Sequence, residues 1–460
     1  MVPSSFPSME SLESLLSRPE SKTLEFKRDL SSPEKVLRTL VAFANGAGGI
    51  LIVGVEDGSK SVVGVANPTK EEERMASLIS DSIHPPLVPE ICLLPWRSIS
   101  VIAVEVFPSG LRPHYLKSKG TPGGVYLRVG STNRSADPAQ VQELQRSVLG
   151  QTFDELPMSE LDSEAIDFRA ASESFAPKRK LAKRDLKTLH LVVRHQRKET
   201  PTVGGMLLFG KNRREFFPEA TVKAAHFAGN DRTQIIDSEE IDCALPAAVE
   251  EVLRFARKNL AKATKISGSR HSENWAFPLV ALREAIANSL VHADYALKGS
   301  PVRFAIFGNR IEIENPGLLL PGLTTTDMQR GVSKLRNRVI GRVFHELGLI
   351  EQWGSGIQRM NQECRNSGFP LPLLEELGQS FRVTFSRAKS EPSGIGAKDS
   401  RILQIVKETP GLTTARIAAR IALTPRATRD RLSKLVEAGS LSVVATGPRD
   451  PKRAFYPSQL

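Results

Sequence analysis

The sequence predicts a multidomain α/β (α+β) chain with an N-terminal α/β domain, a middle α/β sandwich of helices on a mixed sheet, and a small C-terminal module. A length of 460 residues suits several domains of roughly 100–200 residues each. Apolar runs typical of buried strands, such as Ile50–Gly58, alternate with helical patterns such as Pro33–Asn45. The polar segment 386–398, SRAKSEPSGIGAK, lacks periodicity and separates the last module from the rest.

Composition limits the classes of function. The net charge is +12, which favours polyanionic partners. The three cysteines, Cys92, Cys243 and Cys364, are far apart, and this spacing argues against a disulfide framework and a cysteine-based zinc site. We find neither a secretory signal nor an apolar stretch of about 18 residues, so we expect a cytoplasmic protein that does not bind a membrane.

The order of patterns gives the expected division of the chain. Further strands of the N-terminal domain are expected at Ser98–Phe107 and Gly124–Gly130. The expected units are a flexible N-terminus (1–19), the N-terminal domain (20–138), a connecting segment of helices and strands (139–270), the middle domain (271–386), a linker (387–398) and the C-terminal module (399–460).

The connecting segment and the middle domain contain five clear patterns. Pro201–Gly210 reads as a strand, because it is a short apolar run, and Thr221–Gly229 reads as another. Helices are expected from Leu245 to Lys262 and over Pro278–Tyr295. Two hairpin strands follow within Val302–Gly317, with Asn309 as the turn between them.

The C-terminal module has the element order of a winged helix-turn-helix. Helices are predicted over Asp399–Gly411, Leu412–Leu423 and Thr424–Gly439; the last begins with Thr as the cap and Pro at its first position. A hairpin of 440–447 and 453–458 follows, with the basic segment Pro448–Arg453 at its tip. In this fold the third helix enters the major groove of DNA.

Charge supports DNA as the partner of this module. Residues 398–460 carry a net charge of +7, which suits phosphate contacts. The alternative is a small helical dimerisation module with a solvated basic face. The expected DNA contacts are Arg426, Thr428, Arg429, Arg431 and Lys434 on the third helix, and Arg449, Lys452 and Arg453 on the wing.

The middle domain carries a candidate nucleotide site. Glu284 and Asn288 are four residues apart, so they share one helix face, and a carboxylate beside a carboxamide suits a magnesium–phosphate site. Gly354-Ser355-Gly356 precedes a helix, an arrangement by which backbone N–H groups receive phosphate. Asn315-Pro316-Gly317 follows a strand.

Four segments of the middle region together resemble the helicase-related C-terminal segment of GHKL type. They are PTVGGMLLFG, ALREAIANSLVHADY, IEIENPG and RNRVIGRVFHELGLIEQWGSGIQRM. The resemblance implies that ATP binds with Mg²⁺, that Glu284 is the general base, that Asn288 binds the magnesium ion and that Gly354 and Gly356 form a glycine-rich box. The first box departs from the family, because ENPGLLLPG has no Asp to read adenine and Asn315 stands nearest to its place. The alternative is a degenerate domain that scaffolds a dimer. No P-loop occurs in the chain, so a motor helicase is not expected.

The N-terminal domain resembles the Schlafen AlbA-type domain on ESKTLEFKRDL, AFANGAGGILIVGVEDG and YLRVGSTNRSAD. The resemblance implies contact with nucleic acid, DNA or RNA, and for nuclease members it places catalytic carboxylates at Glu20, Glu25 and Asp57. The alternative is that Glu25 pairs with Lys27 or Arg128 and that Asp57 forms an Asp-Gly turn.

The combined expectation is a bacterial-type transcriptional regulator that binds ATP and DNA, in which the nucleotide state modulates DNA binding, as a homodimer or higher homo-oligomer. The alternative is a metal-dependent nuclease that the winged helix directs to its target.

Overall fold

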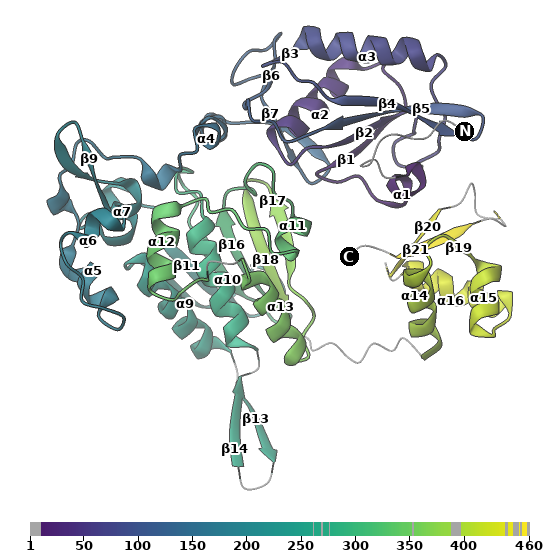
Figure 1. The fold of residues 1–460 in the computed structure, drawn as a ribbon. Helices are drawn as coiled ribbons and strands as arrows, with labels where there is room; N and C mark the ends of the chain where they lie inside the picture. Colours follow the sequence, from purple (N-terminus) through teal and green to yellow (C-terminus); the bar gives the residue numbers. More distant parts are fainter. Residues whose placement is uncertain are drawn as a thin grey trace.

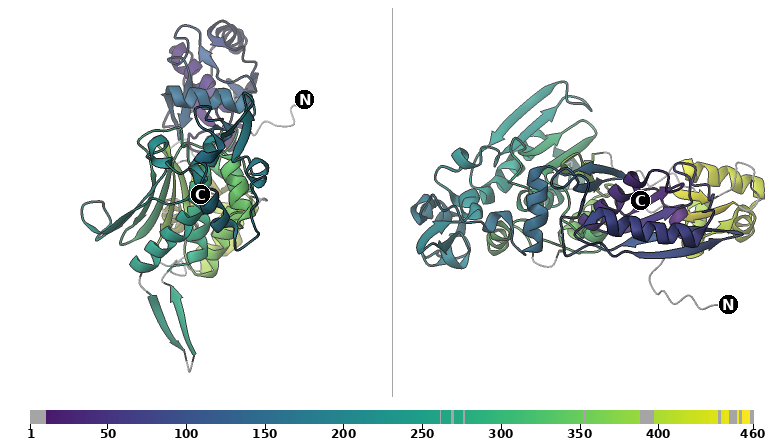
Figure 2. Two further views of the ribbon diagram at one scale, coloured as in Figure 1. Left: turned by 90° about the vertical axis from the view of Figure 1, so that its left-hand side faces the viewer. Right: turned by 90° about the horizontal axis from the view of Figure 1, so that it is seen from above.

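The computed structural model describes residues 11–260, 262–267, 270–275, 277–351, 354–387, 397–437, 440–444, 450 and 453–457. Figure 1 shows the N-terminal unit at the top, the larger middle unit below it, and the C-terminal unit beside them. The two views in Figure 2 show the N-terminal unit extending from one end of the middle unit.

The N-terminal domain is a four-stranded sheet with helices on both faces. In the order β1-β2-β5-β4, only β1 and β2 run parallel to each other. Alternate residues of β2 point to opposite faces, so Leu51 and Val53 pack under α2 and α3 while Ile52 packs toward α1. The elements are α1 (Leu12–Ser17), β1 (Leu24–Lys27), α2 (Pro33–Asn45), β2 (Gly49–Val53), α3 (Pro68–Ser82), β3 (Ile83–His84), β4 (Glu90–Trp96), β5 (Ile99–Val106), β6 (Tyr115–Leu116), β7 (Tyr126–Val129) and β8 (Thr132–Ser135).

Helix α1 differs from the expected flexible N-terminus. Leu12, Leu15 and Leu16 are buried, and they recur at the spacing of one helix face. Sequence analysis missed this amphipathic pattern because it is short and because residues 1–19 are rich in Ser and Pro. The apolar face of α1 packs against the side of the sheet that α2 and α3 leave open.

A mainly helical segment follows α4 (Pro138–Val148) and leads into the middle domain. Its elements are η1 (Phe153–Glu155), η2 (Ser163–Ala165), α5 (Phe168–Phe175), α6 (Asp185–Thr188), β9 (Val192–His195), β10 (Lys198–Pro201), α7 (Val203–Phe209) and α8 (Arg213–Phe216).

The strand expected at Pro201–Gly210 was wrong, because Val203–Phe209 forms helix α7. Thr202 caps the helix, and its hydroxyl oxygen accepts a hydrogen bond of 2.9 Å from the Gly205 N–H. Every residue of α7 is buried, so the run has no polar face and its periodicity does not separate a strand from a buried helix.

The middle domain is an α/β sandwich built on a six-stranded mixed sheet. The strand order is β12-β11-β15-β16-β18-β17, and β11 and β15 are parallel. Helices α9, α10, α12 and α13 share one core with this sheet, and Figure 1 shows α9, α10 and α13 along one face. The elements are β11 (Val222–Phe227), β12 (Ile235–Ile241), α9 (Leu245–Asn259), β13 (Lys262–Ser267), β14 (Arg270–Trp275), α10 (Leu279–His292), β15 (Val302–Ile306), β16 (Arg310–Pro316), α11 (Thr325–Gln329), α12 (Arg338–Glu346), α13 (Gly356–Asn366), β17 (Leu373–Leu377) and β18 (Ser380–Ser386).

The expected boundary between residues 270 and 271 does not separate two domains. It falls at the start of strand β14, and strands from both sides of it form the same sheet. The parallel pairing of β11 with β15 joins residues about 80 positions apart, which local sequence patterns do not reveal.

The C-terminal module has the winged helix fold that the sequence predicts. Helices α14 (Ala397–Glu408), α15 (Thr414–Ile421) and α16 (Pro425–Glu437) pack on a three-stranded sheet of β19 (Leu412–Thr413), β21 (Ala454–Pro457) and β20 (Leu441–Val444). Ile402, Ile417, Leu432 and Phe455 are fully or almost fully buried in its core. Strand β20 lies beside α1 of the N-terminal domain. Most of the expected linker lies outside the described residues.

Among the described residues, no helix combines the length and the apolar character that a membrane-spanning segment requires.

Candidate functional site

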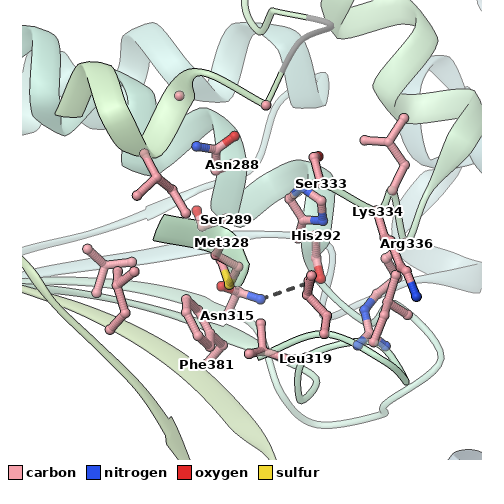
Figure 3. A pocket seen from close by; sticks show the side chains of 18 of the residues that line it. Asn288, Ser289, His292, Asn315, Leu319, Met328, Ser333, Lys334, Arg336 and Phe381 are labelled. Carbon is pink, nitrogen blue, oxygen red and sulfur yellow. Dashed lines mark hydrogen bonds between the residues drawn. The ribbon is translucent and has the colours of Figure 1, made fainter. Parts of the chain in front are cut away.

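One cavity of the middle domain gathers six of the residues that the sequence singled out. It encloses about 1070 Å³, part of which is open to solvent, and Figure 3 shows its lining. Helix α10 contributes Glu284 and Asn288, the end of β16 contributes Asn315 and Gly317, and the turn before α13 contributes Gly354 and Gly356. Residues from three separate parts of the chain therefore meet at one site.

The expected pair on α10 is in direct contact. The Asn288 amide donates a hydrogen bond of 3.3 Å to Glu284 Oε1, and Arg359 Nη1 lies 3.7 Å from Glu284 Oε2. Burial raises the pKa of Glu284, while Arg359 and the Asn288 amide act in the opposite direction. A carboxylate with a raised pKa is better suited to accept a proton near neutral pH than an ordinary one.

The turn before α13 brings the backbone against this pair. A Cβ atom on Gly356 would overlap Glu284 Oε1, so a larger residue at this position would displace the Glu284 carboxylate. Gly354 has a φ of +66°, a conformation that favours glycine. Ser355 is not part of the cavity lining, and its hydroxyl donates a hydrogen bond of 2.5 Å to Glu351.

The segment that corresponds to the family's first box, at Asn315 and Gly317, lies at the opposite side of the cavity. Asn315 is buried, and its amide nitrogen lies 3.5 Å from the carbonyl oxygen of His292, the bond drawn in Figure 3. Gly317 has a φ of +101°, and a Cβ atom there would lie 2.9 Å from Asp294 Cβ. The backbone turns sharply at Gly317 and starts the loop 317–323, most of which lines the cavity.

Sequence reasoning did not single out two cations of this cavity, Lys334 and Arg336. Both precede α12, and Arg336 is the first residue of the segment RNRVIGRVFHE. The only sequence signal for Arg336 was its place within this segment, which resembles the family.

The lining suits a nucleotide with magnesium. Leu319, Leu323, Met328 and Phe381 give the cavity an apolar part, which suits a base. Among the residues that the structure describes, no three His, Cys, Asp or Glu side chains form a metal-binding group. Mg²⁺ commonly takes one or two protein ligands and completes its shell with phosphate oxygens and water, so Asn288 Oδ1 fits that role.

Glu20, Glu25 and Asp57, the carboxylates singled out in the N-terminal domain, do not form a metal-binding group either. Glu25 is buried and paired with both Arg128 and Lys27, the arrangement that the sequence left open as the alternative. Glu20 accepts a hydrogen bond of 2.9 Å from the Phe26 N–H, and burial raises its pKa, with smaller contributions from Glu25 and Asp57. Asp57 is exposed in the turn at Gly58. Glu25 therefore serves the packing of the domain in this structure.

The basic helix α16 presents only part of the expected DNA-binding set. Arg426, Arg429 and Lys434 are exposed. Thr428 is fully buried and donates its hydroxyl to the carbonyl oxygen of Thr424 at 3.0 Å, so the expectation that it contacts DNA was wrong. Its position faces the module's core, which the spacing from Leu432 and Leu435 already suggested.

Arg431 is only partly available to DNA, because its guanidinium pairs with Asp399 of α14 at 2.7 Å. On the wing, Arg453 donates to the carbonyl oxygen of Asp450 at 3.3 Å. Arg449 and Lys452 lie outside the described residues.

Together, the fold and the cavity define a multidomain α/β protein with a C-terminal winged helix. Comparison with family models identifies its parts: residues 20–137 match "Schlafen, AlbA_2", residues 299–385 match "Putative ATP-dependent DNA helicase recG C-terminal", and residues 397–439 match "Winged helix-turn-helix DNA-binding". The chain therefore contains a Schlafen AlbA_2 domain, a RecG-type C-terminal segment and a winged helix-turn-helix DNA-binding domain. Glu284 and Asn288 precede the match at 299–385, although their helix packs on the same sheet.

Two solved structures are similar to the chain. The DIP2311 protein from Corynebacterium diphtheriae shares 19% identity, with 97% of this chain and 95% of that chain covered and a TM-score of 0.44. The N-terminal domain of a RecG-related protein from Nitrosomonas europaea shares 30% identity, with 28% of this chain and 95% of that chain covered and a TM-score of 0.23. No curated protein matches the chain.

Proposed function

We propose that this protein is a DNA-binding transcriptional regulator whose cavity at Glu284 and Asn288 binds ATP with Mg²⁺, and that the nucleotide changes how the winged helix binds DNA. The observation that carries the proposal is that one loop, 317–323, both lines this cavity and contacts the N-terminal domain.

Both the middle domain and the N-terminal domain form hydrogen bonds with loop 317–323. Within the middle domain, the Leu319 N–H donates a hydrogen bond of 2.7 Å to Glu376 Oε1, and Lys22 of the N-terminal domain pairs with the same carboxylate at 2.7 Å. Further along the loop, the Gly322 N–H donates to the carbonyl oxygen of Gly46 at 3.0 Å. A ligand that moves the loop therefore also changes the position of the N-terminal domain.

The winged helix is connected to loop 317–323 through the N-terminal domain. Helix α1 of the N-terminal domain lies beside the wing strand β20. A nucleotide that favours one arrangement of these parts shifts the population of DNA-binding states by its difference in affinity for them. On a two-fold DNA site, this shift would act on two winged helices of a homodimer.

The residues of the cavity have separate roles in this proposal. The bound nucleotide would supply the triphosphate and its magnesium ion, which Asn288 would help to ligate. The backbone N–H groups at the start of α13 would receive the phosphates, and Glu284 would accept a proton from water. Asn315, which stands nearest to the place of the family's Asp, would be one of the polar groups that meet the base.

The test combines nucleotide and DNA binding. A duplex enriched by binding to the full-length protein is titrated by fluorescence anisotropy with and without ATP and Mg²⁺. We expect a shift in DNA affinity of about fivefold or more, the lower range of allosteric coupling. Asn288→Ala should bind no ATP by calorimetry and show no shift, while its DNA affinity without nucleotide stays that of the wild type.

Asn366→Ala is the matched control, since Asn366 is exposed at the end of α13, away from the cavity lining. Equal DNA affinity with and without bound ATP would disprove the regulatory part of the proposal. No ATP binding to the wild type would disprove the role of the cavity.

A further inference from the structure

A second cavity lies between the N-terminal and middle domains, and its charged lining residues are mainly cations. It encloses about 870 Å³, including space open to solvent. The N-terminal domain and α4 contribute Arg112 and Arg146, and the segment before and at the start of α12 contributes Lys334, Arg336 and Arg338. Its only acidic lining residues are Glu143 and Asp294, so its charge is strongly positive.

The two carboxylates of this second cavity are already engaged. Arg336 pairs with Glu143 and lies 3.3 Å from Asp294, and it also donates to the Leu318 carbonyl oxygen. Both acids therefore serve the same cation. Of the other four cations, Arg146 is close enough to Glu143 to favour its ionised form, and none of the four forms a described ion pair with a carboxylate of the cavity lining.

Arg112 provides the second, independent observation. Its Nε and Nη1 atoms are buried, and no group in the described part of the chain accepts a hydrogen bond from either of them. Burial lowers the pKa of Arg112, which reflects the cost of holding this cation without a counter-charge. Buried polar atoms without partners are rare in proteins, because each one gives up its hydrogen bonds to water without replacing them.

The remaining cations have weak or neutral partners. Arg146 lies 5.4 Å from the ring centre of Phe153, and Lys334 donates to the carbonyl oxygen of Pro321 at 3.0 Å. Arg338 donates to the carbonyl oxygen of Gly150 at 2.6 Å, and its distance to Glu155 is 3.6 Å. All of them keep donors that an anion between the domains could use.

We propose that this cavity is a second ligand site, which binds a phosphate-bearing anion between the N-terminal and middle domains. Arginine is suited to this task because its planar guanidinium donates two parallel hydrogen bonds to phosphate. The same phosphate chemistry is available from a free polyphosphate ester and from the backbone of a nucleic acid. The site is distinct from the nucleotide cavity, although Lys334 and Arg336 line both.

The test uses inorganic pyrophosphate with the full-length protein in the absence of Mg²⁺. Pyrophosphate should raise the Tm of the wild type, and calorimetry should show that Arg112→Gln lowers its affinity tenfold or more. Without ligand, Arg112→Gln should have the same Tm as the wild type or a higher one, because the substitution removes a half-buried charge whose Nε and Nη1 have no hydrogen-bond partner among the described residues. Arg134→Gln, an exposed cation of the same domain, is the control and should bind pyrophosphate as the wild type does.

Asn288→Ala separates the two cavities. We expect it to bind pyrophosphate with an affinity within about twofold of the wild-type value, even if the nucleotide proposal fails. Unchanged pyrophosphate affinity in Arg112→Gln, or its loss in Asn288→Ala, would overturn the second site.

A parallel titration with a short single-stranded oligonucleotide identifies the source of the phosphate. A tenfold loss of oligonucleotide affinity in Arg112→Gln assigns the site to a nucleic acid backbone. An unchanged oligonucleotide affinity together with the loss of pyrophosphate binding assigns it to a free polyphosphate ester.

Discussion

At the scale of single residues, the N-terminal domain depends on the pair of Glu25 and Arg128. Arg128 is almost fully buried, its Nε donates to the Ser21 carbonyl oxygen at 2.6 Å, and its guanidinium stacks 5.2 Å from the ring centre of Phe43. Arg128→Met leaves the Glu25 carboxylate buried without this partner. We expect the free energy of unfolding, measured with denaturant, to fall by about 3–5 kcal/mol.

Two further variants test this prediction about Arg128. Arg134→Met, at an exposed site, should change the free energy of unfolding by less than about 0.5 kcal/mol. The double variant Glu25→Gln with Arg128→Met should regain part of the loss, because it also removes the buried charge that has lost Arg128 and keeps only Lys27 as a partner. A loss below about 1 kcal/mol in Arg128→Met would contradict the structural role of the pair.

His292, which lines the cavity of the middle domain, makes the stability of the protein depend on pH. Burial lowers its pKa from 6.5 to about 4, and the neighbouring Arg336 acts in the same direction. A depressed pKa means that the native state disfavours the protonated ring, so the stabilisation is complete above about pH 6.5 and is lost as the pH falls toward 4. Between pH 7 and 4 the wild type should lose up to about 3 kcal/mol more stability than His292→Asn. Parallel unfolding curves for the two proteins over this range would refute the prediction.

At the scale of elements, helix α16 should set the salt dependence of DNA binding. Its exposed cations Arg426, Arg429 and Lys434 are available to phosphates, whereas Arg431 is tied to Asp399. Each phosphate contact contributes about 0.9 to the slope of log affinity against log salt concentration. Changing all three residues to alanine should therefore lower the magnitude of this slope by about 2–3 in anisotropy titrations at several salt concentrations.

Arg169→Ala is the control for α16, because Arg169 is an exposed cation on α5 in another part of the molecule. It should leave the slope unchanged. If the triple variant kept the wild-type slope, the alternative of a basic helix without DNA contacts would be favoured.

At the scale of the whole molecule, the pair of Lys22 and Glu376 should transmit the state of the nucleotide cavity. It joins the N-terminal domain to β17, and Glu376 also accepts a hydrogen bond from loop 317–323. Lys22→Glu should keep ATP affinity within about threefold of the wild-type value. It should also remove the effect of ATP on DNA affinity, because like charges then face each other across the domain boundary.

The charge swap Lys22→Glu with Glu376→Lys provides the matched rescue. It restores opposite charges and should recover at least part of the nucleotide effect, measured by DNA anisotropy with and without ATP. If Lys22→Glu kept the full effect, the transmission would have to follow another path, such as the contact of Gly322 with Gly46.

Local patterns predicted most elements of this chain. Helix α2 begins and ends at the predicted residues, Pro33 and Asn45, and the third helix of the winged helix starts at the expected cap and proline. These signals lie within a few residues, so the sequence displays them directly. The cavity residues Glu284, Asn288 and Gly356 were also predicted, since their motifs are local.

Sequence patterns failed where a contact between distant segments decides the structure. The helix Val203–Phe209 is buried on all sides, so its sequence shows no helical periodicity that would separate it from a buried strand. The burial of Thr428 was missed although its spacing from Leu432 and Leu435 indicated it. The expected boundary at residue 270 failed because β11 pairs with β15 across the hairpin of β13 and β14. The pairing of β11 with β15 gives no signal within a short window of residues.

The amino-acid sequence was therefore sufficient for the order of the domains and for the winged helix, which depend on short-range spacing of apolar, glycine and capping residues. Resemblance of short segments to known families indicated the types of the other two domains and the motifs that meet at the cavity of the middle domain. The partners of the charged residues required the three-dimensional arrangement. Lys22 and Glu376 are 354 positions apart, and Arg336 and Glu143 are 193 apart. A charge acts over a few ångströms in space, whatever the separation along the chain, so only the folded structure showed which charges are neutralised and which, like that of Arg112, remain available.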